Sequence, residues 1–429
     1  MKGKLNLFQA TMLRWRELHP YSAVHVVRVA QPLDAARLER AIDEHLEQLG
    51  LTGLRVDRHR RRYEWAGGRA ATRVRVLRGG GEPLAVVCRE IERELNIAFA
   101  ADGRVDPFRF FAVDDGPSFH LGVAYDHFVG AGDSMVSLLR GFVGRYTDEP
   151  APAASVPLSL YAPTYARLFR RQLWPFLKGL TSLPGLARNC RRSFRPRYAA
   201  PHDGYNAFVH FRVNPPEHAA LTRIATAWDV TPQDLMLAIL LKALSPLAPQ
   251  RWRAPKRNEL AVASIVNVRR DLGAEAENAF APYLASFRVS HPVPADVGLH
   301  DLVAAVSAQT NRIRRGKLYL QTLLALGVAG FEWRFLSAKR RQRFFAKHYP
   351  LCAGITPLSI SPLWPAAGGD TTPVEYLRAV STGPLAPMIV ALTTTGDVVH
   401  AGVSFRTTVF GREAVDVLAA AMLHSIRTL

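Results

Sequence analysis

The stretch that decides the fold is FRFFAVDDGPSFHLGVAYDHFVGAGDSMVSLLRGFVGRY, residues 108–146. Its first half contains two runs of apolar and aromatic residues around the sequence DDGP, which predicts two strands joined by a turn. His127 follows the second strand, and two glycines come after it. Apolar residues then recur at helical spacing over 135–146, so we expect a helix to begin just after the glycines, with Asp133 or Ser134 as its cap.

A histidine between a strand end and a glycine turn has two interpretations. His127 is either a catalytic base held in a tight turn or a histidine whose side chain is satisfied locally. In the second case, the glycines serve only the geometry of the turn.

Strands and helices alternate along the rest of the chain. Residues 21–50 predict a valine-rich strand and an amphipathic helix, with Asp34 as N-cap and Gly50 at the end. Residues 206–244 predict a strand and a pair of helices, and residues 387–426 predict a hairpin with a Gly-Asp turn before a closing helix. The fold class is therefore mixed α/β (α+β).

The length of 429 residues is too great for one small core, so two lobes that share an interface are predicted. The N-terminal lobe would span residues 1–155 and carry the histidine. A basic amphipathic crossover would span 156–200, and a C-terminal lobe would span 201–429.

The composition is typical of a packed globular protein, with 48% hydrophobic and 21% charged residues. The three cysteines are widely spaced and the histidines lack ligand spacing, so neither a disulfide framework nor a metal site is predicted. No signal peptide is recognisable, and the longest apolar run, 318–331, is too short to span a bilayer. We therefore expect a cytoplasmic protein in which this run forms a buried helix or the wall of a pocket.

The chain is strongly basic, with 55 Lys and Arg against 36 Asp and Glu and a net charge of +19. Such a charge favours acidic partners: nucleic acid, anionic lipid, the phosphates of coenzyme A, or an acidic acyl carrier protein. Because no nucleic-acid recognition module is present, we expect no nucleic-acid partner.

Nine of the basic residues lie in the segment that begins at Arg167 and ends at Arg197, which contains no acidic residue. Leu168, Leu173 and Trp174 are among the apolar residues between them. This pattern predicts contact with an acidic and partly apolar partner, either a carrier protein or an anionic membrane. A helix packed on the first lobe, with its arginines in water, is the alternative.

The order of these elements resembles a known superfamily of acyltransferases. Residues 21–50, 93–113, 227–244 and 263–272 are similar to segments of condensation domains, polyketide-associated acyltransferases and wax-ester or alcohol acyltransferases. The resemblance extends along nearly the whole chain. It implies a two-lobed fold of the chloramphenicol-acetyltransferase type, with a tunnel between the lobes.

The signature of that superfamily, HHxxxDG, is degenerate here. Asp126 occupies the position of the first histidine, His127 the second, Ala131 that of the aspartate and Gly132 that of the glycine. The resemblance implies that His127 is a general base, which accepts the proton of an attacking hydroxyl or amine. Gly130 and Gly132 would let the backbone approach a ligand closely.

The missing aspartate matters because, in the superfamily, it pairs with an arginine and holds the loop of the histidine. The resemblance points to Arg269 or Arg270 as that arginine. Asp133 is the nearest acid that could replace the aspartate lost at Ala131, and Ser134 follows it. A simple capping role for Asp133 is the alternative.

Three polar residues of the second lobe complete the predicted site: Asn267, Ser359 and Ser361. The serines fall where the superfamily has a polar strand that faces the histidine, so they are expected to face substrate. Solvated strand hydroxyls are the alternative.

The resemblance implies a stand-alone, bacterial acyltransferase of lipid or natural-product biosynthesis. It would move an acyl group from acyl-coenzyme A, or from an acyl carrier protein's phosphopantetheine, to a hydroxyl or amine. The carrier protein is the favoured donor because it is acidic. No bound cofactor or metal is needed, and a monomer is favoured. The alternative is a degenerate relative that binds a carrier protein or lipid without catalysis, including at the inner face of the membrane.

Overall fold

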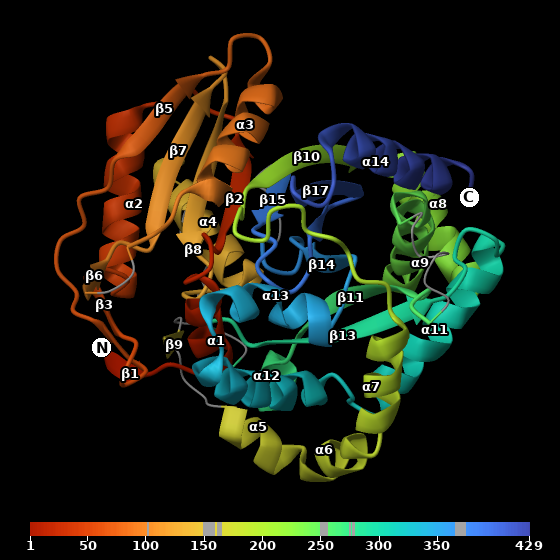
Figure 1. Cartoon of the computed structure of the whole chain (residues 1–429). Helices are drawn as coiled ribbons and strands as arrows, with labels where there is room; N and C mark the ends of the chain where they lie inside the picture. Colours follow the sequence, from red (N-terminus) through yellow and green to blue (C-terminus); the bar gives the residue numbers. More distant parts are fainter. Residues whose placement is uncertain are drawn as a thin grey trace.

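The computed structural model describes residues 1–100, 103–148, 159–160, 165–248, 256–273, 276, 279–364 and 375–429. Two large sheets organise these residues into two lobes, which lie next to each other in Figure 1. The predicted two-lobed α/β fold is confirmed.

The first lobe is built on a sheet with the strand order β15-β2-β8-β7-β5. Its strands are β2 (Ser22–Val29), β5 (Val74–Arg78), β7 (Phe108–Asp114), β8 (Phe119–Asp126) and β15 (Tyr376–Val380). The helices α2 (Ala35–Leu49) and α4 (Gly132–Tyr146) pack on one face, and α3 (Pro83–Asn96) packs on the other (Figure 1). A smaller sheet contains β1 (Lys2–Lys4), β3 (Leu54–Asp57), β4 (Arg62–Trp65) and β6 (Gly103–Val105).

β8 is the central strand of this sheet, and all of its residues are buried. It pairs with β2 on one side and with β7 on the other, both antiparallel. A strand held on both sides is a rigid support. The loop that carries His127 starts at its end.

The second lobe is built on a sheet with the order β10-β17-β16-β14-β11-β13. Its strands are β10 (Asn206–Val213), β11 (Leu260–Asn267), β13 (Leu284–His291), β14 (Ala353–Ser359), β16 (Met388–Thr395) and β17 (Val398–Arg406). Its helices include α8 (Pro215–Ala227), α9 (Pro232–Leu244), α11 (Leu299–Arg315) and α14 (Arg412–Arg427). α9 is the most buried of these helices, because it lies between the sheet and its neighbours (Figure 1).

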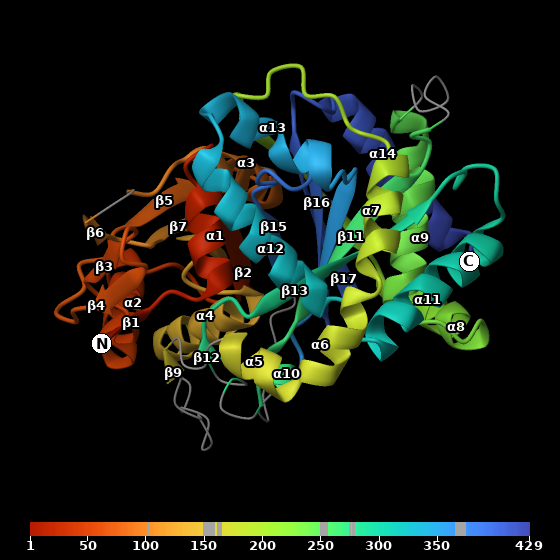
Figure 2. The ribbon, with the colours of Figure 1, turned by 60° about the horizontal axis from the view of Figure 1, so that its bottom comes forward.

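The remaining helices gather along one side of the molecule (Figure 2). They are α1 (Leu7–Trp15), α5 (Tyr165–Arg171), α6 (Leu173–Leu180), α7 (Leu183–Arg192), α10 (Arg269–Leu272), α12 (Leu320–Glu332) and α13 (Ala338–His348), with the 3₁₀ turn η4 (Trp333–Phe335) after α12. A second 3₁₀ turn, η1 (Ser245–Leu247), continues α9 in the second lobe. α12 contacts both α1 and α6. The short strands β9 (Ser159–Leu160) and β12 (Ala279–Phe280) pair with each other.

Several local predictions are confirmed. The Asp34 side chain accepts a hydrogen bond from the backbone of Arg37 and caps α2, and Gly50 ends α2 with φ of 67°. The predicted hairpin is formed by β16 and β17, with Gly396 at φ of 58° in the two-residue turn. A positive φ is the reason why glycine suits both positions.

Two predictions need correction. α4 begins at Gly132, the second glycine, rather than after the glycines, and its N-cap is Ala131, with no side-chain cap. Neither Asp133 nor Ser134 is therefore the cap. In addition, β15 lies beyond residue 201 but pairs with β2 in the first lobe, so the predicted boundary does not separate the two sheets.

The predicted crossover of 156–200 lies partly outside the described residues. Its described part forms β9 and the helices α5, α6 and α7. The apolar run at 318–331 forms most of α12, but it is not fully buried, since Val328 and Phe331 are exposed. Within the described ranges, no helix combines the length and apolar content that crossing a bilayer requires.

Candidate active site

His127 is the first residue after β8, and its side chain is almost completely buried, with 7% of the residue exposed. Nδ1 of the ring lies 3.3 Å from the carbonyl oxygen of Gly130. Because a carbonyl oxygen can only accept, Nδ1 carries the proton in this contact. The lone pair of the neutral ring is then on Nε2, which is the atom able to take a proton.

Aromatic rings hold the imidazole of His127 in place. The ring of Tyr21 stacks on it at 5.4 Å between centroids, and the ring of Tyr125 meets it edge-on at 5.7 Å. The backbone N–H of His127 donates to the carbonyl of Tyr21 at 3.2 Å. Trp15 packs edge-on against Tyr21 in turn. The histidine therefore has a fixed orientation.

This environment keeps the imidazole neutral. Burial lowers the pKa of His127 to about 4, although the hydrogen bond with Gly130 acts in the opposite direction. The positive charge of Arg378 lowers the pKa further. A neutral histidine at physiological pH is a base rather than an acid.

Asp126, at the position of the first motif histidine, has a structural partner. Its carboxylate forms an ion pair with Arg16, just after α1, and both side chains are nearly inaccessible. The backbone N–H of Asp126 donates to Pro107, and its carbonyl accepts from Val129. Asp126 thus fixes the strand end from which His127 extends.

Asp133 connects the loop of His127 to the second lobe. Its carboxylate pairs with Arg269 and accepts a hydrogen bond of 2.7 Å from Nδ2 of Asn267. Arg269 is buried and also donates to Ser134 Oγ at 3.0 Å and to the carbonyl of Ala281 at 2.7 Å. The same carboxylate is therefore not available to cap α4.

The four other predicted site residues are all exposed: Asn267, Arg270, Ser359 and Ser361. The second-lobe side chain nearest to Gly132 is that of Leu358, rather than a serine. Whether the two serines face substrate stays a prediction, as does the tunnel.

Gly130 and Gly132 both have close neighbours. A Cβ at Gly130 would come within 2.6 Å of the Met135 side chain, and one at Gly132 within 3.1 Å of Nη1 of Arg378 and of the Leu358 side chain. Both glycines are therefore tightly packed against protein side chains, and the predicted close approach of a ligand is not what their small size serves here.

A buried cation beside this loop was not predicted from the sequence. Arg378 of β15 is 3% exposed and donates to Thr393 Oγ1 at 2.8 Å and to the carbonyls of Thr356 and Leu392 at 2.7 and 2.8 Å. In the described part of the chain, no carboxylate forms an ion pair with it. Burial lowers the pKa of Arg378 to about 10, which leaves it charged at neutral pH. A lone arginine in an apolar strand was the available signal.

A second buried histidine also lies near His127. Nδ1 of His25, in β2, is 2.8 Å from the hydroxyl of Tyr376, and Nε2 is 3.5 Å from the hydroxyl of Tyr125. Burial places the pKa of His25 well below the usual value, and the positive charge of Arg378 acts in the same direction. His25 was not predicted, because alternation in a valine-rich strand does not distinguish it from a packing residue.

Comparison with known proteins finds similar folds among solved structures. No protein-family model matches the sequence, and the search of curated proteins finds no match. The chain resembles the first condensation domain of the CDA synthetase with a TM-score of 0.67 and 16% identity, over 99% of this chain and 95% of that one.

Two further solved structures agree. The condensation domain of the monacolin K polyketide synthase MokA has a TM-score of 0.65 and 12% identity, over 100% of this chain and 97% of that one. The EpoB cyclization-docking bidomain from Sorangium cellulosum has a TM-score of 0.70 and 12% identity, over 100% of this chain and 84% of that one. The protein therefore has the two-lobed fold of the condensation-domain superfamily.

Proposed function

We propose that the protein is an acyltransferase that moves an acyl group from a thioester to a hydroxyl or amine, with His127 as its general base. The observation that carries this proposal is the buried, neutral imidazole whose Nδ1 is anchored on Gly130. That anchor leaves Nε2 as the proton acceptor. The position of His127, after the central strand of a condensation-domain fold, supports it.

The reaction would proceed in two steps. Nε2 of His127 takes the proton of the acceptor as its oxygen or nitrogen bonds to the thioester carbonyl carbon. The carbonyl oxygen becomes an oxyanion, which then re-forms the double bond and expels the thiolate. The thiolate receives the proton from the imidazolium, so the base is regenerated. A positioned base of this kind contributes about 10²–10⁴-fold to the rate.

Arg378 and Asp133 would assist without taking part in proton transfer. The buried charge of Arg378 opposes protonation of His127 in the resting site, and it would favour the negative charge that develops on the oxyanion. The pairing of Asp133 with Arg269 would hold the loop, which is the task that the resemblance assigns to the aspartate missing at Ala131.

The proposed base has a testable pH dependence. Because the pKa of His127 is about 4, its imidazole stays neutral well below pH 6.5, and a base is active above its pKa. Transfer to a hydroxyl acceptor should stay level from about pH 8 to about pH 5.5, and decline only as the pH nears the pKa. The measurement is kcat/KM against pH, with a hydroxyl acceptor because an amine would itself titrate. A decline centred near pH 6.5, the usual value for histidine, would contradict the assignment.

The acyl donor would be carried by an acyl carrier protein or by coenzyme A, and we favour the carrier. One of the similar structures, the EpoB bidomain, contains a docking domain. The segment from Arg167 to Arg197 adds a second reason. On α6, Leu173, Trp174 and Leu177 are exposed, Trp174 by 80%, among basic side chains. An acidic and partly apolar surface would complement them.

An anionic membrane is the second candidate for this segment. Exposed tryptophan and leucine beside lysine and arginine are typical of helices that lie at a lipid surface. Not all of the basic residues are free to bind, however. Arg171 donates to the carbonyl of Leu272, and Arg192 pairs with Glu259.

The test reverses four exposed charges of the segment to glutamate: Arg170, Lys178, Arg188 and Arg191. Binding to the partner should weaken by about tenfold or more at low salt, and by less at high salt, since screening grows with ionic strength. Binding is measured separately to an acidic carrier protein and to vesicles with anionic lipid. Turnover of a small acyl thioester should not change.

The control reverses four exposed charges elsewhere: Arg40, Arg55, Arg62 and Arg223. If both variants lose the same amount of binding, the effect comes from the net charge of the chain and not from this segment. Unchanged binding to both carrier and vesicles at low ionic strength would mean that the segment is only structural.

A further inference from the structure

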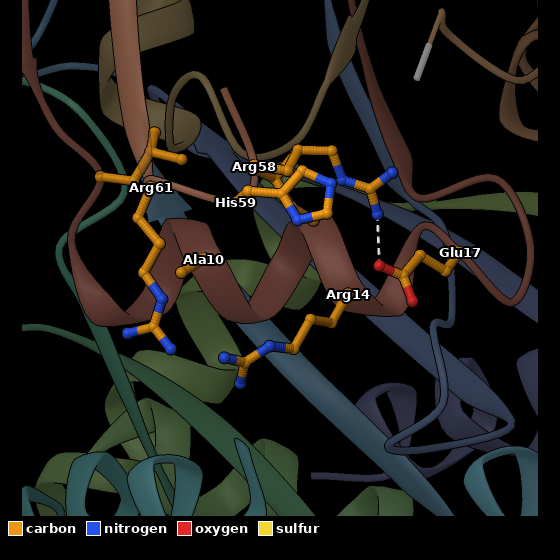
Figure 3. Close-up of a pocket in the computed structure, with 8 residues that line it drawn as sticks. Ala10, Arg14, Glu17, Arg58, His59 and Arg61 are labelled. Carbon is orange, nitrogen blue, oxygen red and sulfur yellow. Dashed lines mark hydrogen bonds and ion pairs between the residues drawn. The ribbon is translucent and has the colours of Figure 1, made fainter. Parts of the chain in front are cut away.

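A cavity of about 270 Å³ lies against α1, and its lining includes none of the residues assigned to acyl transfer. It is lined by Leu5, Ala10, Leu13, Arg14, Glu17, Arg58, His59 and Arg61. Helix α1 and the residues next to it supply the first five, and the turn between β3 and β4 supplies the rest (Figure 3). The lining contains three arginines and a single acid.

The acid does not neutralise this cluster. Glu17 forms an ion pair with Arg58 (Figure 3). Its other oxygen lies 3.7 Å from Nη1 of Arg341. Throughout the described residues, no carboxylate forms an ion pair with Arg14 or Arg61. Two positive charges of the cavity are therefore left without a counter-ion.

Arg14 occupies an electrostatically unfavourable position. Partial burial lowers the pKa of its guanidinium, and the charges of Arg61, Arg334 and Arg341 lower it further, while Glu17 alone opposes them. Like charges that share a partly dehydrated space repel, and a bound anion would relieve that repulsion. Figure 3 shows the guanidinium groups of Arg14 and Arg61 extended toward the same side of α1.

Two backbone features support this arrangement. Gly330 in α12 gives Arg14 its space, because a Cβ at this glycine would overlap Nη1 of Arg14. Arg61 has φ of 53°, in the left-handed region that few side-chain-bearing residues adopt. Arg61 is the last residue of the short loop between β3 and β4, where a left-handed residue is common, and this conformation fixes the point from which its side chain leaves the loop.

The chemistry of the cavity identifies the class of ligand. Two guanidinium groups that line one cavity and form no ion pair with its single carboxylate suit a phosphate, which accepts several hydrogen bonds at once. Leu5, Ala10 and Leu13 form an apolar part of the lining, which would contact the organic part of a ligand larger than phosphate itself. We propose that this cavity binds an organic phosphate, with Arg14 and Arg61 as the residues that hold the phosphate group.

The experiment is calorimetric titration of the purified chain, without turnover. The probes are inorganic phosphate, adenosine 3′,5′-bisphosphate, 4′-phosphopantetheine and a short-chain phosphatidic acid below its micelle concentration. At least one organic phosphate should bind about tenfold more tightly than inorganic phosphate, because it adds apolar contact. The probe that binds most tightly identifies the source as a nucleotide, a carrier arm or a lipid.

Two pairs of variants locate the binding. Arg14→Gln/Arg61→Gln should weaken it about tenfold or more, since hydrogen bonds to charged groups are lost. Arg55→Gln/Arg62→Gln removes the same charge from exposed positions outside the lining and should have little effect.

The second pair changes no charge. Gly330→Ala should displace the Arg14 head group and weaken binding about tenfold, as expected for loss of a charged contact. Gly327→Ala, on the same helix with nothing within 4 Å of the added Cβ, should bind like the wild type.

The proposal is overturned if no organic phosphate binds more tightly than inorganic phosphate. It is also overturned if binding survives both Arg14→Gln/Arg61→Gln and Gly330→Ala, or if the surface variant Arg55→Gln/Arg62→Gln loses as much affinity. Because no turnover is measured, none of these results bears on acyl transfer.

Discussion

His127→Ala should lower acyl transfer by about 10²–10⁴-fold, the range for loss of a positioned general base. The ring makes one hydrogen bond, to Gly130, and its removal leaves the ion pair of Asp126 with Arg16 in place. We therefore expect the variant to fold. The measurements are the initial rate of thiol release from an acyl thioester and the circular dichroism spectrum.

His45→Ala is the matched control. His45 belongs to α2, packs edge-on against Phe142, and has a pKa lowered by burial to about 4, like that of His127. It has no place in the proposed site, so its loss should leave the rate nearly unchanged. Equal turnover in His127→Ala and the wild type would remove His127 from the mechanism.

Arg269→Met should lower the free energy of unfolding by about 3–5 kcal/mol, because it leaves the largely buried Asp133 carboxylate without its cation. The hydrogen bonds to Ser134 and to the carbonyl of Ala281 are lost as well. Acyl transfer should also decline, since the loop of His127 is no longer tied to the second lobe. Chemical denaturation and the transfer rate measure the two effects.

The control for this variant is the next residue. Arg270 is exposed, and Arg270→Met should change stability by no more than about 0.5 kcal/mol. If both variants are equally stable, or if Arg269→Met loses stability but retains full activity, the pair with Asp133 does not brace the active loop.

Local signals in the sequence predicted much of the fold. The strand and helix of residues 21–50 follow from alternation, a capping aspartate and a terminal glycine, all of which act within a few residues. The strand that ends before His127 was recognisable for the same reason. The length predicted two lobes that share an interface, whereas the type of two-lobed fold was expected only from the resemblance.

Contacts between distant residues explain what local signals did not predict. Asp133 has a high preference for capping, but Arg269 and Asn267 occupy its carboxylate, and Ala131 becomes the N-cap. Both partners lie more than one hundred residues further along the chain. Tertiary pairing of this kind overrides local preference.

The site residues on β15 were missed for a related reason. This strand is short and joins the sheet of the first lobe from far along the chain, pairing with β2. Nothing in its sequence indicates which sheet it joins, so Arg378 and Tyr376 could not be placed near His127. The buried charge of Arg378 is satisfied by carbonyl oxygens and a threonine, which no sequence pattern reveals.

Detection of the acylated product is the decisive test of acyl transfer by this chain. The purified chain is incubated with acyl-pantetheine, acyl-coenzyme A or an acylated carrier protein, together with hydroxyl and amine acceptors, and the thiol and the ester or amide are quantified by mass spectrometry. We expect the wild type to form thiol and acylated acceptor in equal amounts, and product formation to depend on His127. A wild-type chain that binds an acyl carrier or lipid but transfers no acyl group would contradict this expectation, and would indicate a binding protein without catalysis.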